Sequence, residues 1–95
     1  MADKLCDDAV NAGLDDLPGW SLENAKLHRE FKFANFVEAF GFMTSAAIEA
    51  EKMDHHPEWF NVYSKVVVDL TTHSAGGITD LDFELARKMS KLADD

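Results

Sequence analysis

The spacing of apolar side chains changes its period along this 95-residue chain, and that change limits the folds available to it. Residues 20–33 alternate apolar and polar side chains, which is typical of two short antiparallel strands joined by a turn at 23–25. Residues 36–55 instead repeat apolar side chains at helical spacing, and residues 60–72 alternate once more. A last helical stripe follows, so strands and helices succeed one another along the chain.

The long central helix has recognisable ends in the sequence. Asn35, followed three residues later by Glu38, resembles a capping box and predicts the start of a helix. Pro57 predicts its end near His55, because the residue before a proline is disfavoured in the α region and proline cannot donate to a helical hydrogen bond. The apolar stripe of this helix consists of Phe36, Val37, Phe40, Met43, Ala47 and Ile48.

Two further helices follow from similar signals. Residues 4–12 are predicted to form a short helix that ends near Gly13. Gly76-Gly77 ends the second alternating run, and Thr79 is a suitable N-cap for the last helix. The stripe of that last helix consists of Leu81, Leu85, Met89 and Leu92.

The second alternating run predicts which of its side chains enter the core. One face is expected to be buried, and a turn or bulge is expected within residues 61–64. The buried face consists of Phe60, Val62, Ser64, Val66, Val68, Leu70 and Thr72. We therefore expect a single α+β domain over residues 1–95, in which a four-stranded antiparallel sheet carries about three helices packed on one face.

The composition excludes several classes of protein. Eighteen acidic against nine basic residues give a formal charge of −9, which repels phosphate backbones and anionic membranes, so no direct nucleic-acid or membrane partner is expected. Cys6 is the only cysteine, which excludes an internal disulfide and suits a reducing compartment. No apolar run approaches the roughly 18 residues of a membrane span, and the first residues lack the pattern of a secretory signal. A cytoplasmic protein is therefore expected.

Two groups of polar residues are candidates for chemistry. Glu51, His55 and His56 lie at the predicted end of the long helix, where Glu51 would stand one turn before His55 and orient its imidazole. Residues 71–73 (TTH) lie at the end of the valine-rich strand, just before the two glycines. Asp82 follows near the start of the last helix.

Most of these residues also have a purely structural explanation. A helix C-terminus favours a protonated imidazole through the helix dipole, which alone would account for His55 or His56. Asp82 stands three residues after Thr79, where an acidic side chain commonly caps a helix. The choice between structure and chemistry stays open for each residue taken alone.

The residue types favour proton transfer over the other chemistries. Three histidines and two carboxylates supply enough ligands for zinc or iron, but adjacent histidines do not easily reach one ion, and neither H-x-H nor H-E-x-x-H occurs. Cys6 has no histidine near it in sequence and no serine has an elbow motif, which argues against a nucleophile. Imidazoles without a nucleophile suit general acid–base catalysis, and this is as far as the residues lead.

A resemblance to a known family goes further. The segment EKMDHHPEWFNVY at residues 51–63, then Thr72-His73, then residues 77–79 (GIT) with Asp82, resembles the pterin-4a-carbinolamine dehydratases. The similarity extends upstream through Gly19-Trp20, the two phenylalanines at 31 and 33, and residues 40–43 (FGFM). It covers most of the chain after residue 17 and rests on several motifs in the same order.

This resemblance implies a reaction and a set of site residues. The reaction is the dehydration of 4a-hydroxytetrahydrobiopterin to quinonoid dihydrobiopterin, which regenerates the pterin used by aromatic amino-acid hydroxylases without a metal or other cofactor. The implied catalytic residues are His55, His56, His73, Glu51 and Asp82. The implied substrate-binding residues are Asp54, His55, His56, Thr71, Thr72, His73 and Ser74.

The resemblance also suggests a role for each catalytic residue. His55 and His73 would flank the pterin as acid and base, in an order that the sequence does not decide, and His56 would position the ring. Glu51 would orient His55, and Asp82 would support His73 while capping its helix.

A second function class comes from the same resemblance. Animal members also act as a dimerization cofactor of a hepatocyte nuclear transcription factor, so a transcription-factor partner and a nuclear location are the alternative. Members commonly form homotetramers through the long helix, and a homotetramer or homodimer is expected here. Its stripe could bury against copies of itself or simply pack on the chain's own sheet. Ser74 and Ala75 stand where animal members often carry an acidic residue and a cysteine, which puts cysteine-linked regulation in doubt.

Overall fold

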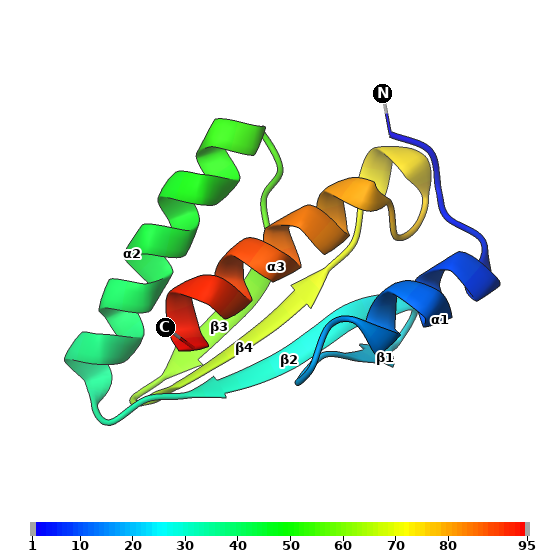
Figure 1. Ribbon diagram of the computed structural model, residues 1–95. Coiled ribbons are helices and arrows are strands. Elements are labelled where there is room, and N and C mark those ends of the chain that lie inside the picture. Colours follow the sequence, from blue (N-terminus) through cyan, green and yellow to red (C-terminus); the bar gives the residue numbers. More distant parts are fainter. Residues whose placement is uncertain (1, 95) are drawn as a thin grey trace.

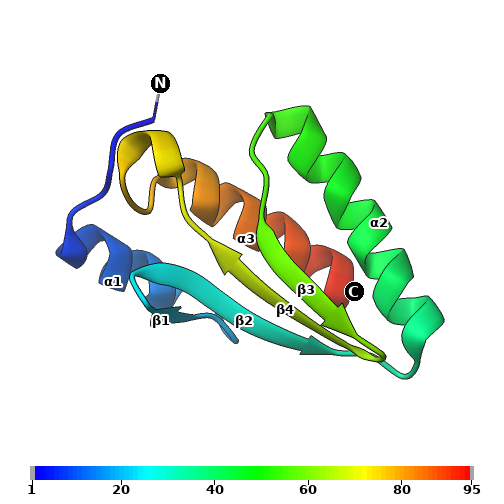
Figure 2. The same cartoon turned by 180° about the vertical axis from the view of Figure 1, so that it is seen from behind.

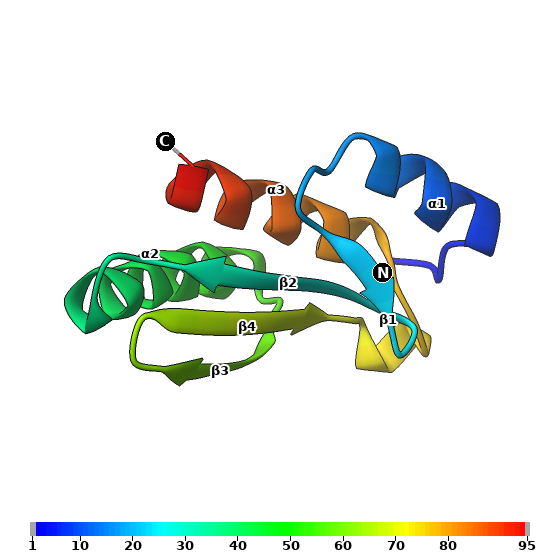
Figure 3. The same cartoon turned by 90° about the horizontal axis from the view of Figure 1, so that it is seen from below.

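The computed structural model describes residues 2–94, and the first and last residues of the predicted domain lie outside this range. Four antiparallel strands form one sheet in the order β1-β2-β4-β3, and the α-helices lie on one of its faces (Figure 1, Figure 3). The predicted α+β class is confirmed. The elements are α1 (Asp7–Asp15), β1 (Ser21–Glu23), β2 (Lys26–Lys32), α2 (Phe36–Met53), β3 (Glu58–Val62), β4 (Lys65–Leu70), the 3-10 turn η1 (His73–Ala75) and α3 (Asp80–Asp94).

The core lies between the sheet and the two long helices. β4 contributes valines and a leucine, because its inward side chains alternate with outward ones. α2 faces the sheet mainly with alanines, whose small side chains let the helix approach closely. Burial of a large apolar side chain stabilises the fold by about 1.5–3 kcal/mol. The fully buried apolar residues include Leu27, Ala39, Ala46, Val66, Val68, Leu85, Ala86 and Met89.

The first helix lies three residues later than predicted. Residues 4–12 were expected to be helical, but α1 spans Asp7–Asp15. Leu5 donates its main-chain N–H to the carbonyl of Ile78 at 2.8 Å, which holds the segment before α1 extended. Gly13 lies inside the helix, and its missing side chain makes room for Phe83: an added Cβ would lie 2.6 Å from that ring.

In the strand after Pro57, the buried side chains are not the ones that the alternating pattern predicted. Tyr63 and Ser64 form a two-residue turn between β3 and β4, with Tyr63 at a φ of 53°. Paired residues of a hairpin share a face, and Val62 pairs with Lys65, so the parity of the alternation changes at the turn. The predicted burial of Phe60 and Val62 is therefore wrong: they are 53% and 58% exposed.

The other face of the sheet carries no helix among the described elements (Figure 2). Outward side chains of β2 and β3 form ion pairs on this open face, including Lys26 with Glu58. His28 of β2 lies 2.8 Å from Asp69 of β4, through its Nδ1. In the part of the chain that the structure describes, none of the helices combines the length and apolar character needed to span a bilayer.

The predicted stripe of α2 points mostly away from the sheet. Asn35 caps this helix as expected, and its side chain accepts the N–H of Glu38 at 2.8 Å. The helix buries Phe42 and three of its alanines, at 39, 46 and 50. Phe36 and Phe40 are exposed, so the alternative that they pack on the chain's own sheet is wrong. The exposed apolar face of α2, as we call it below, consists of Phe36, Val37, Phe40 and Ile48.

Candidate active site

His55 is buried where α2 ends and α3 begins, and its ring meets a carboxylate there. Its Nε2 lies 2.6 Å from Oδ1 of Asp82 in the first turn of α3. Asp82 is fully buried and His55 is only 8% exposed. A buried carboxylate needs donors that replace the lost water, and an imidazole N–H is one of them. The pair is therefore held in one geometry inside the protein.

Asp82 also joins two threonines to this pair. Its Oδ2 accepts from the hydroxyl of Thr72 at 2.8 Å and from the main-chain N–H of Thr79 at 2.9 Å. The two threonine hydroxyls lie 2.8 Å apart, and that of Thr79 accepts the N–H of Leu81. The predicted capping of α3 by Thr79 is confirmed, with Asp82 as the acid of the capping box. One carboxylate thus caps a helix and holds His55.

His73 lies at the open face of the sheet and is exposed to solvent. Its Nε2 is 2.7 Å from Oε2 of Glu58, the first residue of β3, and its side chain is 79% exposed. Oε1 of Glu58 accepts from Nζ of Lys26 at 2.6 Å.

The two donors around Glu58 determine its ionisation. The hydrogen bond from Lys26, and after it the one from His73, hold the pKa of Glu58 below its usual value. The carboxylate therefore stays ionised to a lower pH than an isolated glutamate. Because the folded-state pKa is lowered, the small stabilisation from these exposed contacts is present above the ordinary pKa and is lost as the pH falls through the lowered one.

The end of α2 determines the partner of Glu51. Helical spacing paired Glu51 with His55, and this pairing is wrong. The helix ends at Met53, and Asp54 adopts the left-handed conformation with a φ of 52°, so the chain leaves the helix there. His55 turns into the protein, while Nε2 of His56 comes within 2.8 Å of Oε1 of Glu51 on the surface.

The strand end determines the partner of Asp82. The predicted support of His73 by Asp82 is wrong. Thr72 continues the buried face of β4 and reaches Asp82, whereas His73, the next residue, turns to Glu58. Thr72 is extended and His73 begins η1, so the chain turns between these neighbours and they find different partners.

A cavity of about 310 Å³ lies beside His73. The turn between β1 and β2 forms one wall and the loop around η1 forms another. The volume is at the lower end of the range for small-molecule sites. The cavity is lined by Asn24, Ala25, Lys26, Thr71, His73, Gly76 and Gly77.

The remaining predicted site residues lie at different depths. Asp54 and Ser74 are exposed, and Thr71 is half-buried in the wall of the cavity. Thr72 is buried, its hydroxyl is bonded to Asp82, and its carbonyl accepts three N–H groups of the η1 loop. Contact of these residues with a substrate stays a prediction.

Sequence reasoning missed Glu58 and Lys26. Glu58 belongs to the DHHPEWF segment and stands two residues after His56, so its position was a signal that went unused. Lys26 is 32 residues away in sequence, and only the pairing of strands brings it to Glu58. Neither the Lys26–Glu58 contact nor the Glu58–His73 contact could be inferred without the order of strands in the sheet.

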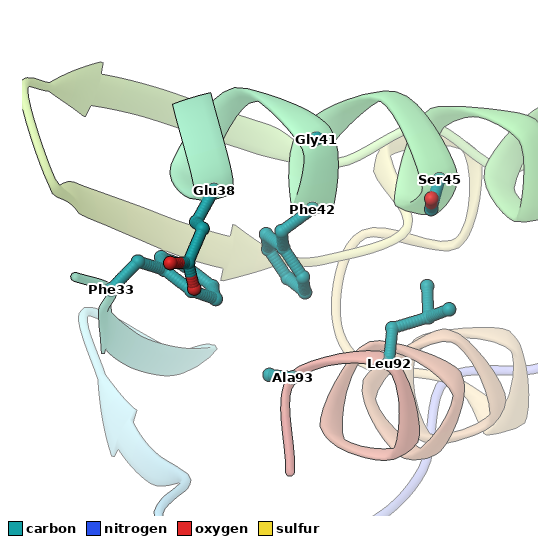
Figure 4. A pocket seen from close by; sticks show the side chains of 7 residues that line it. All are labelled: Phe33, Glu38, Gly41, Phe42, Ser45, Leu92 and Ala93. Carbon is teal, nitrogen blue, oxygen red and sulfur yellow. The ribbon is translucent and has the colours of Figure 1, made fainter. Parts of the chain in front are cut away.

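Another pocket, of about 290 Å³, lies between α2, the end of β2 and the last turns of α3 (Figure 4). Its side chains are mainly apolar, and Glu38 and Ser45 are the polar ones among its lining residues. No histidine lines it. The residues around this pocket are Phe33, Glu38, Gly41, Phe42, Ser45, Leu92 and Ala93.

The arrangement of side chains suits proton transfer. His55 and His73 each have a carboxylate at one ring nitrogen, and residues 72 and 73 link the two pairs along the chain. An imidazole can donate and accept protons near neutral pH, and a carboxylate partner fixes which nitrogen carries the proton. Among residues 2–94, no group of three or more histidine, cysteine, aspartate or glutamate side chains is placed as metal ligands are.

Comparison with known proteins places the chain in a family. A family model described as pterin 4 alpha carbinolamine dehydratase matches residues 3–92. A protein of Solibacter usitatus, provisionally named pterin-4-alpha-carbinolamine dehydratase, is 56% identical, with 98% of each chain covered. A protein of the same name from Rhizobium johnstonii is 63% identical over 90% of this chain and 86% of its own.

A solved structure agrees with these relatives. The crystal structure of a protein from Brucella melitensis, described as a transcriptional coactivator/pterin dehydratase, superposes with a TM-score of 0.94 at 48% identity. It covers 96% of this chain and 99% of the other. The histidine and carboxylate pairs described above thus occur in a chain that belongs to the pterin 4 alpha carbinolamine dehydratase family, a family of lyases.

Proposed function

We propose that this protein dehydrates 4a-hydroxytetrahydrobiopterin to quinonoid dihydrobiopterin by acid–base catalysis of its histidines, and so returns the pterin cofactor to aromatic amino-acid hydroxylases. The observation that carries the proposal is the pair of carboxylate-bound imidazoles, His55 with Asp82 and His73 with Glu58, at one end of the sheet. Family membership supports the choice of a pterin carbinolamine as substrate.

The reaction needs only the groups that this site offers. An acid protonates the departing hydroxyl, and a base takes the ring N–H proton as the C=N bond forms. The C–O bond breaks and water leaves. The acid gives up one proton and the base takes one, so the protein has no net gain or loss of protons. His55 and His73 fill these two roles in our proposal, and His56 positions the ring.

The proposal requires neither a metal nor a resident cofactor. Both histidines already have a carboxylate at Nε2, which leaves Nδ1 of each ring for the substrate. Asp82 holds His55, and Glu51 holds His56 through a hydrogen bond between two exposed side chains. The cavity beside His73 supports a small planar substrate at that histidine.

The direct test is dehydration of chemically generated 4a-hydroxytetrahydropterin, followed by absorbance with and without the protein. We expect acceleration that is unchanged after treatment with a chelator. Absence of acceleration would contradict the proposed reaction. Loss of acceleration with the chelator, restored by added metal, would contradict the metal-free mechanism alone.

The exposed apolar face of α2 supports a second role in assembly. We propose that it joins copies of this chain into a homodimer or homotetramer, with a transcription-factor partner as the alternative occupant. Val37 is 78% exposed and Phe40 is 54% exposed, and large apolar side chains gathered on one helix face usually mark an interface. The rings of Phe36 and Phe40 lie 5.7 Å apart, so a partner would meet an aromatic pair. The Brucella melitensis protein's description as a coactivator favours the alternative.

Phe40→Glu is expected to abolish this assembly, because a charge cannot be buried in an apolar interface without a partner. Light scattering coupled to size exclusion should give a multiple of the 10.6 kDa chain mass for the wild type and one chain mass for the variant. Leu22→Glu is the matched control, since Leu22 is 47% exposed on β1. A wild type of one chain mass would contradict self-association and favour the partner.

A further inference from the structure

Glu58 stands between a lysine and a histidine that come from distant parts of the chain. Lys26 belongs to β2 and Glu58 to β3, and β4 lies between these two strands. The lysine therefore reaches across a whole strand to make its 2.6 Å contact. The other carboxylate oxygen lies 2.7 Å from Nε2 of His73. Glu58 thus joins Lys26 and His73, and both of these side chains line the cavity beside His73.

The chemistry of the three groups determines which of them donates each hydrogen bond. Lysine can only donate hydrogen bonds, and an ionised carboxylate can only accept them. Glu58 is ionised at neutral pH, and the hydrogen bonds from Lys26 and His73 lower its pKa further. The proton between Glu58 and His73 therefore resides on Nε2 of the imidazole.

We propose that Glu58, itself held by Lys26, is a positioning residue for His73: it fixes the imidazole as the tautomer protonated at Nε2 and leaves Nδ1 to exchange a proton with the substrate. This assignment rests on the proposed dehydration. As a base, neutral His73 takes the ring N–H proton of the carbinolamine on Nδ1. As an acid, its imidazolium gives the Nδ1 proton to the hydroxyl that leaves as water. In either direction Nε2 keeps its proton.

Stability does not explain the contacts of Glu58. The side chains of Lys26 and Glu58 are 34% and 39% exposed, and that of His73 is 79% exposed. Ion pairs between exposed side chains contribute little to folding, because water screens them and both side chains lose conformational freedom. An exposed histidine without a partner would sample several ring orientations and both tautomers. The effect of Glu58 is therefore to orient the ring of His73.

The test combines a tautomer measurement with kinetics. In protein with ¹⁵N-labelled histidine, the nitrogen chemical shifts of neutral His73 report which ring nitrogen is protonated. We expect Nε2–H in the wild type and a mixture of tautomers in Glu58→Ala. For the same variant we expect kcat to fall by about 10- to 100-fold, the range found when the outer partner of a metal-binding imidazole is removed. The midpoint of urea unfolding should stay unchanged.

Two further variants sharpen the test. Glu58→Gln keeps an oxygen that accepts from Nε2 but loses the charge that Lys26 binds, so it should keep the tautomer and lose less of kcat than Glu58→Ala. Glu30→Ala is the matched control, because Glu30 is an exposed acid of β2 on the same face of the sheet. It should leave both readouts unchanged.

The outcomes separate this inference from the proposed function. An unchanged tautomer in Glu58→Ala overturns the positioning role, and so does an altered tautomer with unchanged kcat. A wild type that does not accelerate dehydration overturns the proposed function, and with it the catalytic part of this inference. The tautomer shift would then show the Glu58–His73 contact as structural only.

Discussion

Replacing both His55 and His73 is expected to slow dehydration of the pterin carbinolamine by about 10³-fold or more, because a positioned acid or base each contributes about 10²- to 10⁴-fold. The variant to use is His55→Gln/His73→Ala. Glutamine can still donate an N–H to Asp82, so the buried carboxylate keeps a donor and the fold is preserved. The measurement is single-turnover dehydration at saturating enzyme, which excludes product release from the rate.

Each single variant should lose most of this activity, because the effects of removing groups that act in the same step are not additive. His73→Ala alone removes an exposed side chain and should leave unfolding unchanged. His28→Ala is the control: it removes another imidazole, on β2, that contacts Asp69 instead of the site. A folded double variant that dehydrates the pterin at the wild-type rate would refute the acid–base assignment.

Asp82→Ala is expected to destabilise the protein by about 3–5 kcal/mol, the usual cost of removing one partner from a buried charged pair. The substitution leaves the ring of His55, the hydroxyl of Thr72 and the N–H of Thr79 without their acceptor. Each of these groups is buried, so water does not readily replace the carboxylate. Domains of this size have a total stability of about 5–15 kcal/mol, so the loss is a large fraction of it.

Urea unfolding at pH 7 measures this effect, and Asp80→Ala provides the control. Asp80 is an exposed acid in the same first turn of α3, and its removal should cost less than about 1 kcal/mol through the helix dipole alone. If the two variants lose equal stability, Asp82 acts only as a helix-terminal charge, and its buried hydrogen bonds contribute nothing beyond that.

The local signals in the sequence predicted elements more reliably than they predicted faces. The Asn35 cap and the Thr79 cap are confirmed, because a cap involves residues within one turn of each other. The burial of Phe60 and Val62 was wrong, because a two-residue turn changed the parity of the strand. Local propensity indicates where a turn can form, but it does not give the number of residues in the turn.

The candidate site shows the same division. The sequence alone named the three histidines and the two carboxylates, and two of its pairings failed at points where the backbone changes direction. The left-handed residue Asp54 separated His55 from Glu51, and the opposite orientation of Thr72 and His73 separated His73 from Asp82. At Asp54 a positive φ redirects the chain, and after Thr72 the extended chain gives way to η1.

By itself, the sequence determined the order of elements, the α+β class and the family, because these depend on periodicity, caps and motifs that lie close together along the chain. Only the tertiary structure decided that Asp82 holds His55, that Lys26 and His73 both bind Glu58, and that Phe36 and Phe40 face outward. These contacts depend on the strand order β1-β2-β4-β3 and on the parity of turns, which join residues up to 32 positions apart in ways that no local pattern encodes.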